Sequence, residues 1–305
     1  MTPISLASIG RRRFLHGAGI AAGSLACGGA PLARAAQAEL IARQPGAELK
    51  LSGQDGVIPG RDLREKVLRM EEWGMQGIEL WGGGLPGRIQ EIKDALRGTA
   101  LRVSAICAGF DGVPISHDPA VREQAIQSIN AISAAAGELG STGLIIVPAF
   151  NGQTELGFVE GRKLLLEVLA NIGEHAHRAG TRILLEPLNR GEAWFLRLLA
   201  DAAAICRDAN HPGVAVMGDF YHMNIEETSD LGAFLSAGAH LHHVHLASAK
   251  RNLPGQDERS FVGGFRGLKA IGYHDYCSFE CGVVGDRAVE IPKSLEFLRR
   301  QWAEA

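Results

Sequence analysis

The stretch Val214-Ala-Val-Met-Gly-Asp-Phe-Tyr-His222 places a carboxylate, Asp219, at the end of an apolar run. The same pattern, an apolar run followed by a side chain that can bind a metal, occurs three more times in the C-terminal half of the chain. The other stretches are Ile183-Leu-Leu-Glu-Pro-Leu-Asn-Arg190, His242-His-Val-His245 and Tyr276-Cys-Ser-Phe-Glu280. If each run is a parallel strand of one closed barrel, the four side chains converge at its C-terminal mouth, where (β/α)8 barrels place their chemistry.

Strand-like runs alternate with helical patterns about eight times, which is typical of a parallel sheet. We expect strands at residues 48–52, 77–81, 101–107, 143–148, 182–187, 214–219, 241–247 and 276–281. We expect helices from Arg61 to Gly74, from Asp118-Pro119 onward, and at residues 287–302. The sequence therefore predicts an α/β fold with a single (β/α)8 TIM barrel over residues 39–305, close to the usual length of about 250 residues.

The four strand-end side chains form an oxygen-rich set with a single imidazole. They are Glu186, Asp219, His245 and Glu280. Such a set predicts one divalent metal ion, Mn²⁺ or Co²⁺ by preference, and it also accepts Mg²⁺ or Zn²⁺. The alternation of a strand points both His243 and His245 into the barrel. We interpret His240, His242 and His243 as buried, hydrogen-bonded histidines rather than ligands.

The residues around these ligands resemble a known family. Glu186-Pro-Leu-Asn-Arg-Gly-Glu192, Asp219-Phe-Tyr-His-Met-Asn-Ile-Glu-Glu227 and His245, with Arg251 and Pro254-Gly255, are similar to the ketose 3-epimerase (tagatose/psicose) branch of the xylose-isomerase-like barrels. The resemblance implies a sugar isomerase or epimerase in which the four ligands hold one metal ion. It also implies that two of them, Glu186 and Glu280, act as acid and base. The residues expected to grip the sugar substrate are Glu192, His222 and Arg251.

The chemistry of proton transfer beside a carbonyl agrees with this interpretation, because it needs a base, an acid and an electrophile that stabilises an enediolate. Three other enzyme classes stay open. The first is a lyase or hydratase acting on 3-keto-glycosides through the same metal and carboxylates. The second is a hydroxypyruvate isomerase, in which Gln commonly stands at the position of His245. The third is an apurinic-site endonuclease, which needs further His ligands on early strands, where the segments Glu79-Leu-Trp81 and Ile106-Cys-Ala108 offer none. A sugar-binding protein of the periplasm is the non-enzymatic alternative, although such proteins are normally two-lobed.

The N-terminus has the pattern of a twin-arginine signal peptide. A basic segment, Gly10-Arg-Arg-Arg-Phe-Leu15, precedes a Gly/Ala-rich apolar run and the small-residue sites Ala33-Arg-Ala35 and Ala36-Gln-Ala38. The run is too short and too rich in Gly for a stable membrane span. We therefore expect residues 1–38 to direct export to the periplasm by the twin-arginine machinery. Cys27 leaves a lipoprotein alternative, although Ser24 stands where a lipobox has Leu.

The net charge of the chain limits its possible partners. Without the four Arg of the leader, 27 basic residues face 34 acidic ones, a net charge of −7, which excludes nucleic acid as a natural partner. We expect the remaining cysteines to be buried free thiols; they are Cys107, Cys206, Cys277 and Cys281. We expect the loops at residues 81–87, 109–114 and 247–264 at the catalytic face, with an aromatic wall for the sugar made of Trp81, Phe110, Phe150 and Trp194. Core packing explains each aromatic residue equally well, and the sequence leaves the oligomeric state, including a homo-oligomer, open.

Overall fold

Eight parallel strands lie side by side in the order β1-β8-β7-β6-β5-β4-β3-β2 in the computed structural model, which describes residues 46–305. The strands are β1 (Lys50–Gly53), β2 (Gly77–Trp81), β3 (Arg102–Cys107), β4 (Leu144–Ile146), β5 (Ile183–Leu185), β6 (Val214–Asp219), β7 (Leu241–Leu246) and β8 (Tyr276–Phe279). A parallel bridge between Gln54 and Glu79 joins β1 to β2 and closes the barrel. The expected signal peptide and Cys27 lie outside the described residues.

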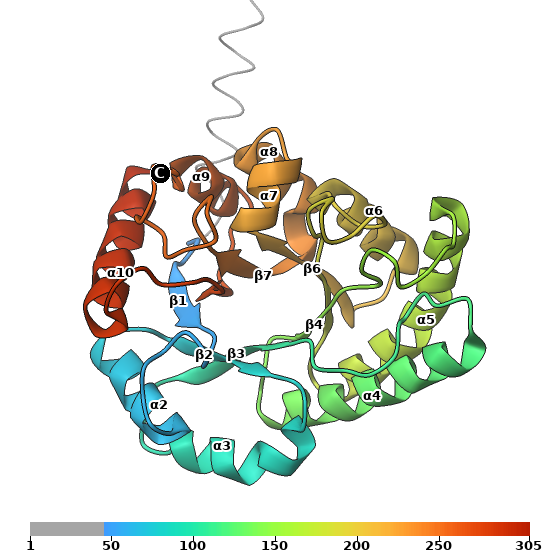
Figure 1. Ribbon diagram of the computed structural model, residues 1–305, viewed down its shortest axis with the longest axis horizontal. Coiled ribbons are helices and arrows are strands. Elements are labelled where there is room, and N and C mark those ends of the chain that lie inside the picture. Colours follow the sequence, from blue (N-terminus) through green and yellow to red (C-terminus); the bar gives the residue numbers. More distant parts are fainter. Residues whose placement is uncertain (1–45) are drawn as a thin grey trace, which may run out of the picture. The chain divides into compact units, whose positions relative to one another are not determined.

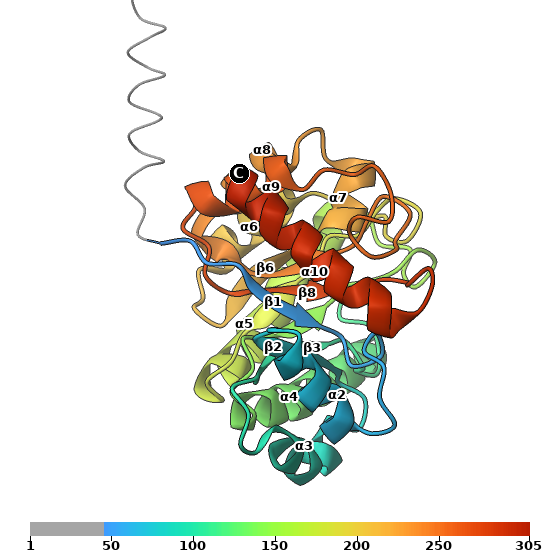
Figure 2. The same ribbon diagram turned by 90° about the vertical axis from the view of Figure 1, so that its left-hand side faces the viewer.

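Helices surround the strands on the outside, as Figure 1 shows along the barrel and Figure 2 from the side. They are α2 (Leu63–Glu72), α3 (Ile89–Leu96), α4 (Pro119–Glu138), α5 (Phe158–Arg178), α6 (Leu199–Ala209), α7 (Phe220–Glu226), α8 (Asp230–Ala237), α9 (Val262–Ala270) and α10 (Arg287–Glu304), with short 3₁₀ turns η1 (Leu85–Arg88) and η2 (Gly238–His240). Side-chain caps set several helix starts: Asp62, Asp118 and Asp286 each accept a hydrogen bond from the first turn of α2, α4 and α10. The chain thus alternates strand and helix, as the sequence predicts.

The alternation along each strand separates an outer layer from the barrel interior. Val244 and Cys277 face outward into the main apolar core. Ile145, Leu184 and Met217 belong to a separate apolar cluster inside the barrel. The register pairs Asp219 of β6 with His245 of β7, so ligands from neighbouring strands arrive at the same height.

The predicted barrel is confirmed, and β2 and β6 have the expected bounds. The strands β4 and β5 are shorter than expected, with three residues each instead of the six of 143–148 and 182–187. Pro148 and Pro187 lie just beyond them, and proline has no N–H to donate to a strand ladder. Glu186 therefore lies directly after β5, and Glu280 directly after β8.

The four cysteines between residues 46 and 305 are free thiols, as predicted. We also expected them to be buried, which holds for Cys107, Cys206 and Cys277, whereas Cys281 is partly exposed. Within this same part of the chain, no helix combines the length and apolar character needed to cross a membrane.

Candidate active site

Glu186, Asp219, His245 and Glu280 come together at the carboxyl ends of β5 to β8. Each offers one ligand atom, and these atoms all lie within 4.8 Å of one another. Nδ1 of His245 lies 3.4 Å from Glu280, 3.7 Å from Glu186 and 3.9 Å from Asp219. The side chains of a metal site surround a common point in this way, since N and O ligands lie about 2.0–2.2 Å from such an ion.

Two buried atoms of this group have no hydrogen-bond partner: Oδ2 of Asp219 and Nδ1 of His245. Buried polar atoms of proteins are rarely left unpaired, because desolvation then costs free energy without compensation. Both atoms face the other ligands, so a divalent cation bound among them would satisfy both. The residues present therefore fit the metal ion that the sequence predicts.

The electrostatics of the group also favour a cation. Burial raises the pKa of Asp219 well above its usual range, and the charge of Glu280 adds to this. Burial likewise raises the pKa of Glu186. Burial alone would lower the pKa of His245, but the charges of Glu79 and Glu280 outweigh it and raise this pKa well above 6.5. A metal ion would replace these protons as the positive charge of the site.

Arg251 reaches the site from the loop after β7. Its guanidinium donates to Oε2 of Glu280 at 3.0 Å and to Oε1 of Glu192 at 3.4 Å, and it stacks over the ring of Tyr221 at 4.8 Å. A guanidinium presents several donors in one plane. Arg251 thus has N–H groups beside two of the carboxylates, where a sugar oxygen can be bound.

His222 is held as a neutral donor. Its Nδ1 accepts hydrogen bonds from the backbone N–H and the side-chain amide of Asn189, at 3.1 and 2.8 Å. The proton therefore resides on Nε2, which is buried without a partner and lies 3.6 Å from Asp219. Burial and the charge of Arg251 lower the pKa of His222 to about 3, so the ring stays neutral. The Nε2–H of His222 thus points at Asp219, within the ligand group.

A cavity of about 470 Å³ opens above the ligands. Trp81, Phe110 and Phe150 line it, and 55% of the Trp81 surface is exposed. Gly109 has a φ of 83°, and a Cβ there would collide with the backbone of the Trp81 loop, so glycine lets the two loops pack closely. The expected position of these loops at the catalytic face is confirmed.

Trp194 is not part of this aromatic wall, which corrects the prediction. It is partly buried against the main core, with its ring 5.4 Å from that of Phe195. The sequence shows an aromatic residue after a strand end but not the direction of its side chain.

The cavity reaches only half of the ligand group. Glu186 and Glu280 line it together with Glu192 and Arg251. Asp219 and His245 lie beneath them with no exposed surface. A molecule in the cavity therefore meets the two Glu ligands and not the other two.

Comparison with known proteins places this arrangement in a family. A family model described as the xylose isomerase-like TIM barrel matches residues 67–301. The chain belongs to this family. A 3-dehydro-D-guloside 4-epimerase of Escherichia coli (strain K12) is 33% identical over 261 residues, which are 82% of this chain and 99% of that protein.

Other relatives of this xylose isomerase-like barrel are also epimerases. A ketose 3-epimerase of Arthrobacter globiformis is 28% identical and shares 71% of this chain and 76% of its own. The apo crystal structure of a 3-keto-D-glucoside 4-epimerase from E. coli superposes with a TM-score of 0.78 at 30% identity, over 83% of this chain and all of that chain. The expected family and the expected isomerase class are confirmed.

Three polar residues around the ligands were missed by the sequence analysis. Asn189 holds both His222 and Glu192, the latter at 2.9 Å. Gln54 donates to Glu280, and Glu79 is buried beneath His245. The sequence did contain one indication for Glu79, which is a charged residue inside the apolar strand 77–81. Burying an unpaired charge there would cost free energy, so a partner could have been expected.

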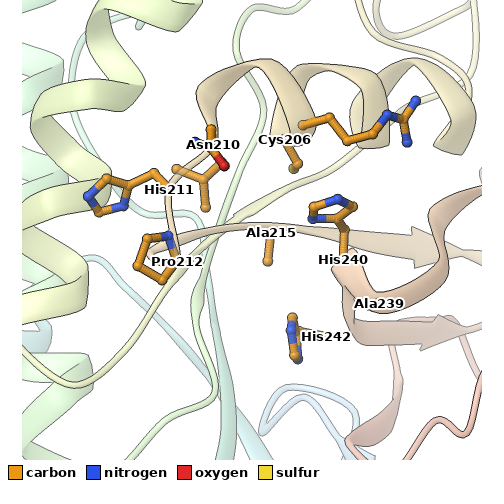
Figure 3. Close-up of a pocket in the computed structure, with 10 residues that line it drawn as sticks. Cys206, Asn210, His211, Pro212, Ala215, Ala239, His240 and His242 are labelled. Atoms are coloured by element: carbon orange, nitrogen blue, oxygen red, sulfur yellow. The ribbon is translucent and has the colours of Figure 1, made fainter.

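His243 is buried and hydrogen-bonded, as expected, with Nε2 2.7 Å from Glu79. His242 bonds Asp275 at 2.7 Å but is partly exposed, and His240 is also partly exposed, so the prediction of burial is wrong for both. These two residues line a separate hollow at the amino ends of β6 and β7, beside α6 (Figure 3). That end of a barrel contributes to stability rather than chemistry.

Proposed function

We propose that this chain is a divalent-metal-dependent epimerase that inverts a carbon beside the carbonyl group of a keto-sugar. The observation that carries the proposal is the division of the ligand group, in which Glu186 and Glu280 face the cavity while Asp219 and His245 are buried. The two Glu come from β5 and β8, on either side of the strands that supply the other two ligands. Two carboxylates that flank one carbon can remove a proton on one side and return it on the other.

The environments of the two carboxylates differ in the metal-free site. Burial raises the pKa of Glu186, whereas His245 and Arg251 outweigh burial at Glu280 and lower its pKa to about 2. When bound, the divalent cation supplies a Lewis acid that polarises the carbonyl and orients the sugar. Mn²⁺ suits this donor set best, with Co²⁺, Mg²⁺ and Zn²⁺ as alternatives.

The residues above the ligands supply the grip on the sugar. Arg251 offers N–H groups to sugar oxygens beside Glu280. His222, which the sequence also predicts at the sugar, is buried outside the cavity lining, with its Nε2–H 3.6 Å from Asp219. Glu192, held by Asn189, accepts from a sugar hydroxyl. Arg251 and Glu192 bind and orient the substrate so that the reacting carbon lies between the two Glu.

We propose a glycoside of a keto-sugar as the substrate, rather than a free ketose. Two relatives that are at least 30% identical over more than four-fifths of this chain act on a 3-dehydro-D-guloside and a 3-keto-D-glucoside by name. The cavity of about 470 Å³ lies within the usual range for ligand pockets, and the exposed face of Trp81 at its mouth gives an apolar surface for a second ring. We also propose export to the periplasm, where glycosides are available; fractionation of cells tests this.

Deuterium incorporation from D₂O tests the activity. The metal-loaded enzyme is incubated with a panel of 3-keto-glycosides and free ketoses, and products are read by NMR and mass spectrometry. We expect deuterium at the carbon beside the carbonyl together with formation of the epimer. Exchange followed by loss of the aglycone would assign a lyase instead. Absence of exchange in every substrate, with metal bound, would refute the proposal.

An endonuclease with three zinc ions finds no support in residues 46–305. The second group of possible ligands there, Glu79, His243 and His245, shares His245 with the first group. Hydrogen bonds already join its members.

A further inference from the structure

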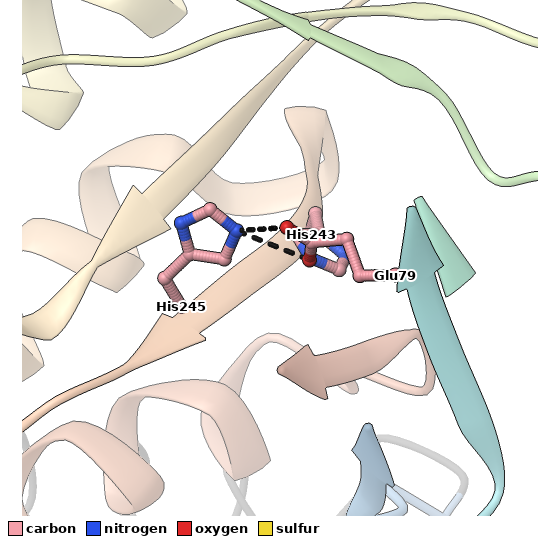
Figure 4. A group of neighbouring side chains, drawn as sticks. All are labelled: Glu79, His243 and His245. Atoms are coloured by element: carbon pink, nitrogen blue, oxygen red, sulfur yellow. Dashed lines mark hydrogen bonds and ion pairs between the residues drawn. The ribbon is translucent and has the colours of Figure 1, made fainter. Parts of the chain in front are cut away.

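Glu79 is a buried carboxylate directly beneath the ligand group. It lies on β2, in the barrel interior, with no exposed surface. Its oxygens contact Nε2 of His243 at 2.7 Å and Nε2 of His245 at 3.0 and 3.1 Å. Figure 4 shows the His245 ring with one nitrogen toward Glu79 and the other facing away from it.

This contact determines which nitrogen of His245 can bind a metal. A carboxylate oxygen accepts hydrogen bonds, so the proton of the neutral ring resides on Nε2. The lone pair of Nδ1 is then directed at Glu186, Asp219 and Glu280. An acceptor on the far nitrogen also raises the basicity of a ligating imidazole and fixes the orientation of the ring.

Glu79 is linked to a second ligand through Gln54. The side-chain amide of Gln54 donates to Oε1 of Glu79 at 2.8 Å and to Oε1 of Glu280 at 3.0 Å. The backbone bridge between Gln54 and Glu79 is also the one that closes the barrel between β1 and β2. The closure of the barrel thus places one carboxylate within reach of two of the four ligands.

A second metal ion bound by Glu79, His243 and His245 is the competing interpretation of this cluster. The separation of 2.7 Å between Glu79 and His243 is that of a hydrogen bond. Ligands about 2.0–2.1 Å from a tetrahedral ion lie about 3.3 Å apart. Proton-mediated contacts therefore describe the cluster better than a second cation does.

We propose that Glu79 is a positioning residue whose negative charge sets the affinity of the site for a divalent cation, by orienting His245 directly and Glu280 through Gln54. The proposal rests on the metal site of the proposed function. The proposal depends on the negative charge of Glu79. A Gln side chain at this position keeps the shape and the packing but lacks the charged oxygen that accepts the hydrogen bond from His245.

The test compares the dissociation constant for Mn²⁺ of the full-length folded protein with that of Glu79→Gln, measured by calorimetric titration. We expect binding about 10–100-fold weaker in Glu79→Gln, the usual effect of losing such an outer partner. Ser104→Ala is the matched control, since Ser104 is buried in the same barrel and bonds Ser52 but no ligand. The control should lower Tm and leave the dissociation constant unchanged.

The outcomes separate this proposal from the proposed function. If the unaltered protein binds no Mn²⁺, the metal site itself fails. If it binds Mn²⁺ and Glu79→Gln binds equally well, only the role of Glu79 is refuted. Should Glu79→Gln not fold, Gln54→Met serves in its place, because Gln54 is partly exposed and its loss removes the hydrogen bonds that join Glu79 to Glu280. We then expect a several-fold weaker affinity, and an unchanged affinity would overturn the proposal.

Discussion

In the proposed function, Glu186 and Glu280 each combine two tasks, since both belong to the candidate ligand group and both line the cavity. A carboxylate that binds a cation through one oxygen retains a second oxygen for proton transfer. Asp219 and His245 do not line the cavity, so in the proposed function they can only hold the metal ion. The proposed roles of the four residues therefore follow from how deeply each side chain lies in the barrel.

Replacing either Glu by Gln should separate ligation from proton transfer. Gln keeps a carbonyl oxygen but has no basic site, so metal affinity should fall modestly while turnover falls about 10²–10⁴-fold. Each variant should still exchange the proton of one epimer with D₂O without interconverting the two, because one carboxylate serves each face of the carbon. NMR of both epimers in D₂O measures this.

The control for this experiment is Glu155→Gln, an exposed carboxylate outside the cavity, which should leave turnover unchanged. Loss of exchange with both epimers in both variants, with metal retained, would contradict the two-face mechanism. A single-base isomerase or a lyase would then explain the site better.

At the scale of the elements, Asp219 joins the end of β6 to the start of α7. Its Oδ1 accepts from the backbone N–H of Tyr221 at 2.6 Å and caps the helix, while Oδ2 faces the ligand group without a partner. One carboxylate thus has a structural oxygen and a functional oxygen. Variants that keep one and remove the other can separate the two roles.

Asp219→Asn should keep the helix cap and weaken metal binding. Asn is as good a helix cap as Asp, and the raised pKa of Asp219 means that a neutral side chain suits the metal-free site. We expect the Tm of the metal-free protein to be maintained and Mn²⁺ affinity to fall about 10-fold or more. Asp219→Ala should lose affinity and also about 1 kcal/mol of stability.

Asp118 is the matched control, because it caps α4 and belongs neither to the ligand group nor to the cavity lining. Asp118→Ala should lower stability by a similar amount, and Asp118→Asn should not; neither should change metal affinity. A large loss of metal-free stability in Asp219→Asn would show that the charge itself supports the fold. Thermal unfolding followed by circular dichroism, with and without Mn²⁺, gives all of these values.

The individual strands show how far sequence alone predicts the site. The apolar run before Asp219 gives β6 and its ligand directly, because strand period and strand end are local properties. Glu79 could not be assigned in this way, since its partners His243 and His245 are 164 and 166 residues away in sequence. The assignment of Trp194 to the aromatic wall failed for the same reason, because its neighbours are set by packing between elements that are distant in sequence.

At the scale of the whole molecule, the proposed metal site predicts that folding and metal binding are coupled through protons. Glu79 and Glu280 have lowered pKa values and stay ionised between about pH 5 and about pH 8. Asp219, Glu186 and His245 have raised pKa values and hold protons more tightly when folded than when unfolded. Without metal, their contribution to stability is fully present at low pH and is lost as the pH rises through their folded pKa values.

A bound divalent cation should reverse this trend. The cation needs these groups deprotonated, so binding releases protons and its apparent affinity rises with pH, about tenfold per unit for each proton released. Because a ligand stabilises the folded state by RT ln(1 + [L]/Kd), the increase in Tm caused by a fixed Mn²⁺ concentration should grow from about pH 5 to about pH 8. Calorimetric Tm values across this range, with and without Mn²⁺, check it. An increase in Tm that is constant or shrinks as the pH rises would mean that no proton leaves the site on binding, and the three buried groups would then not be the ligands.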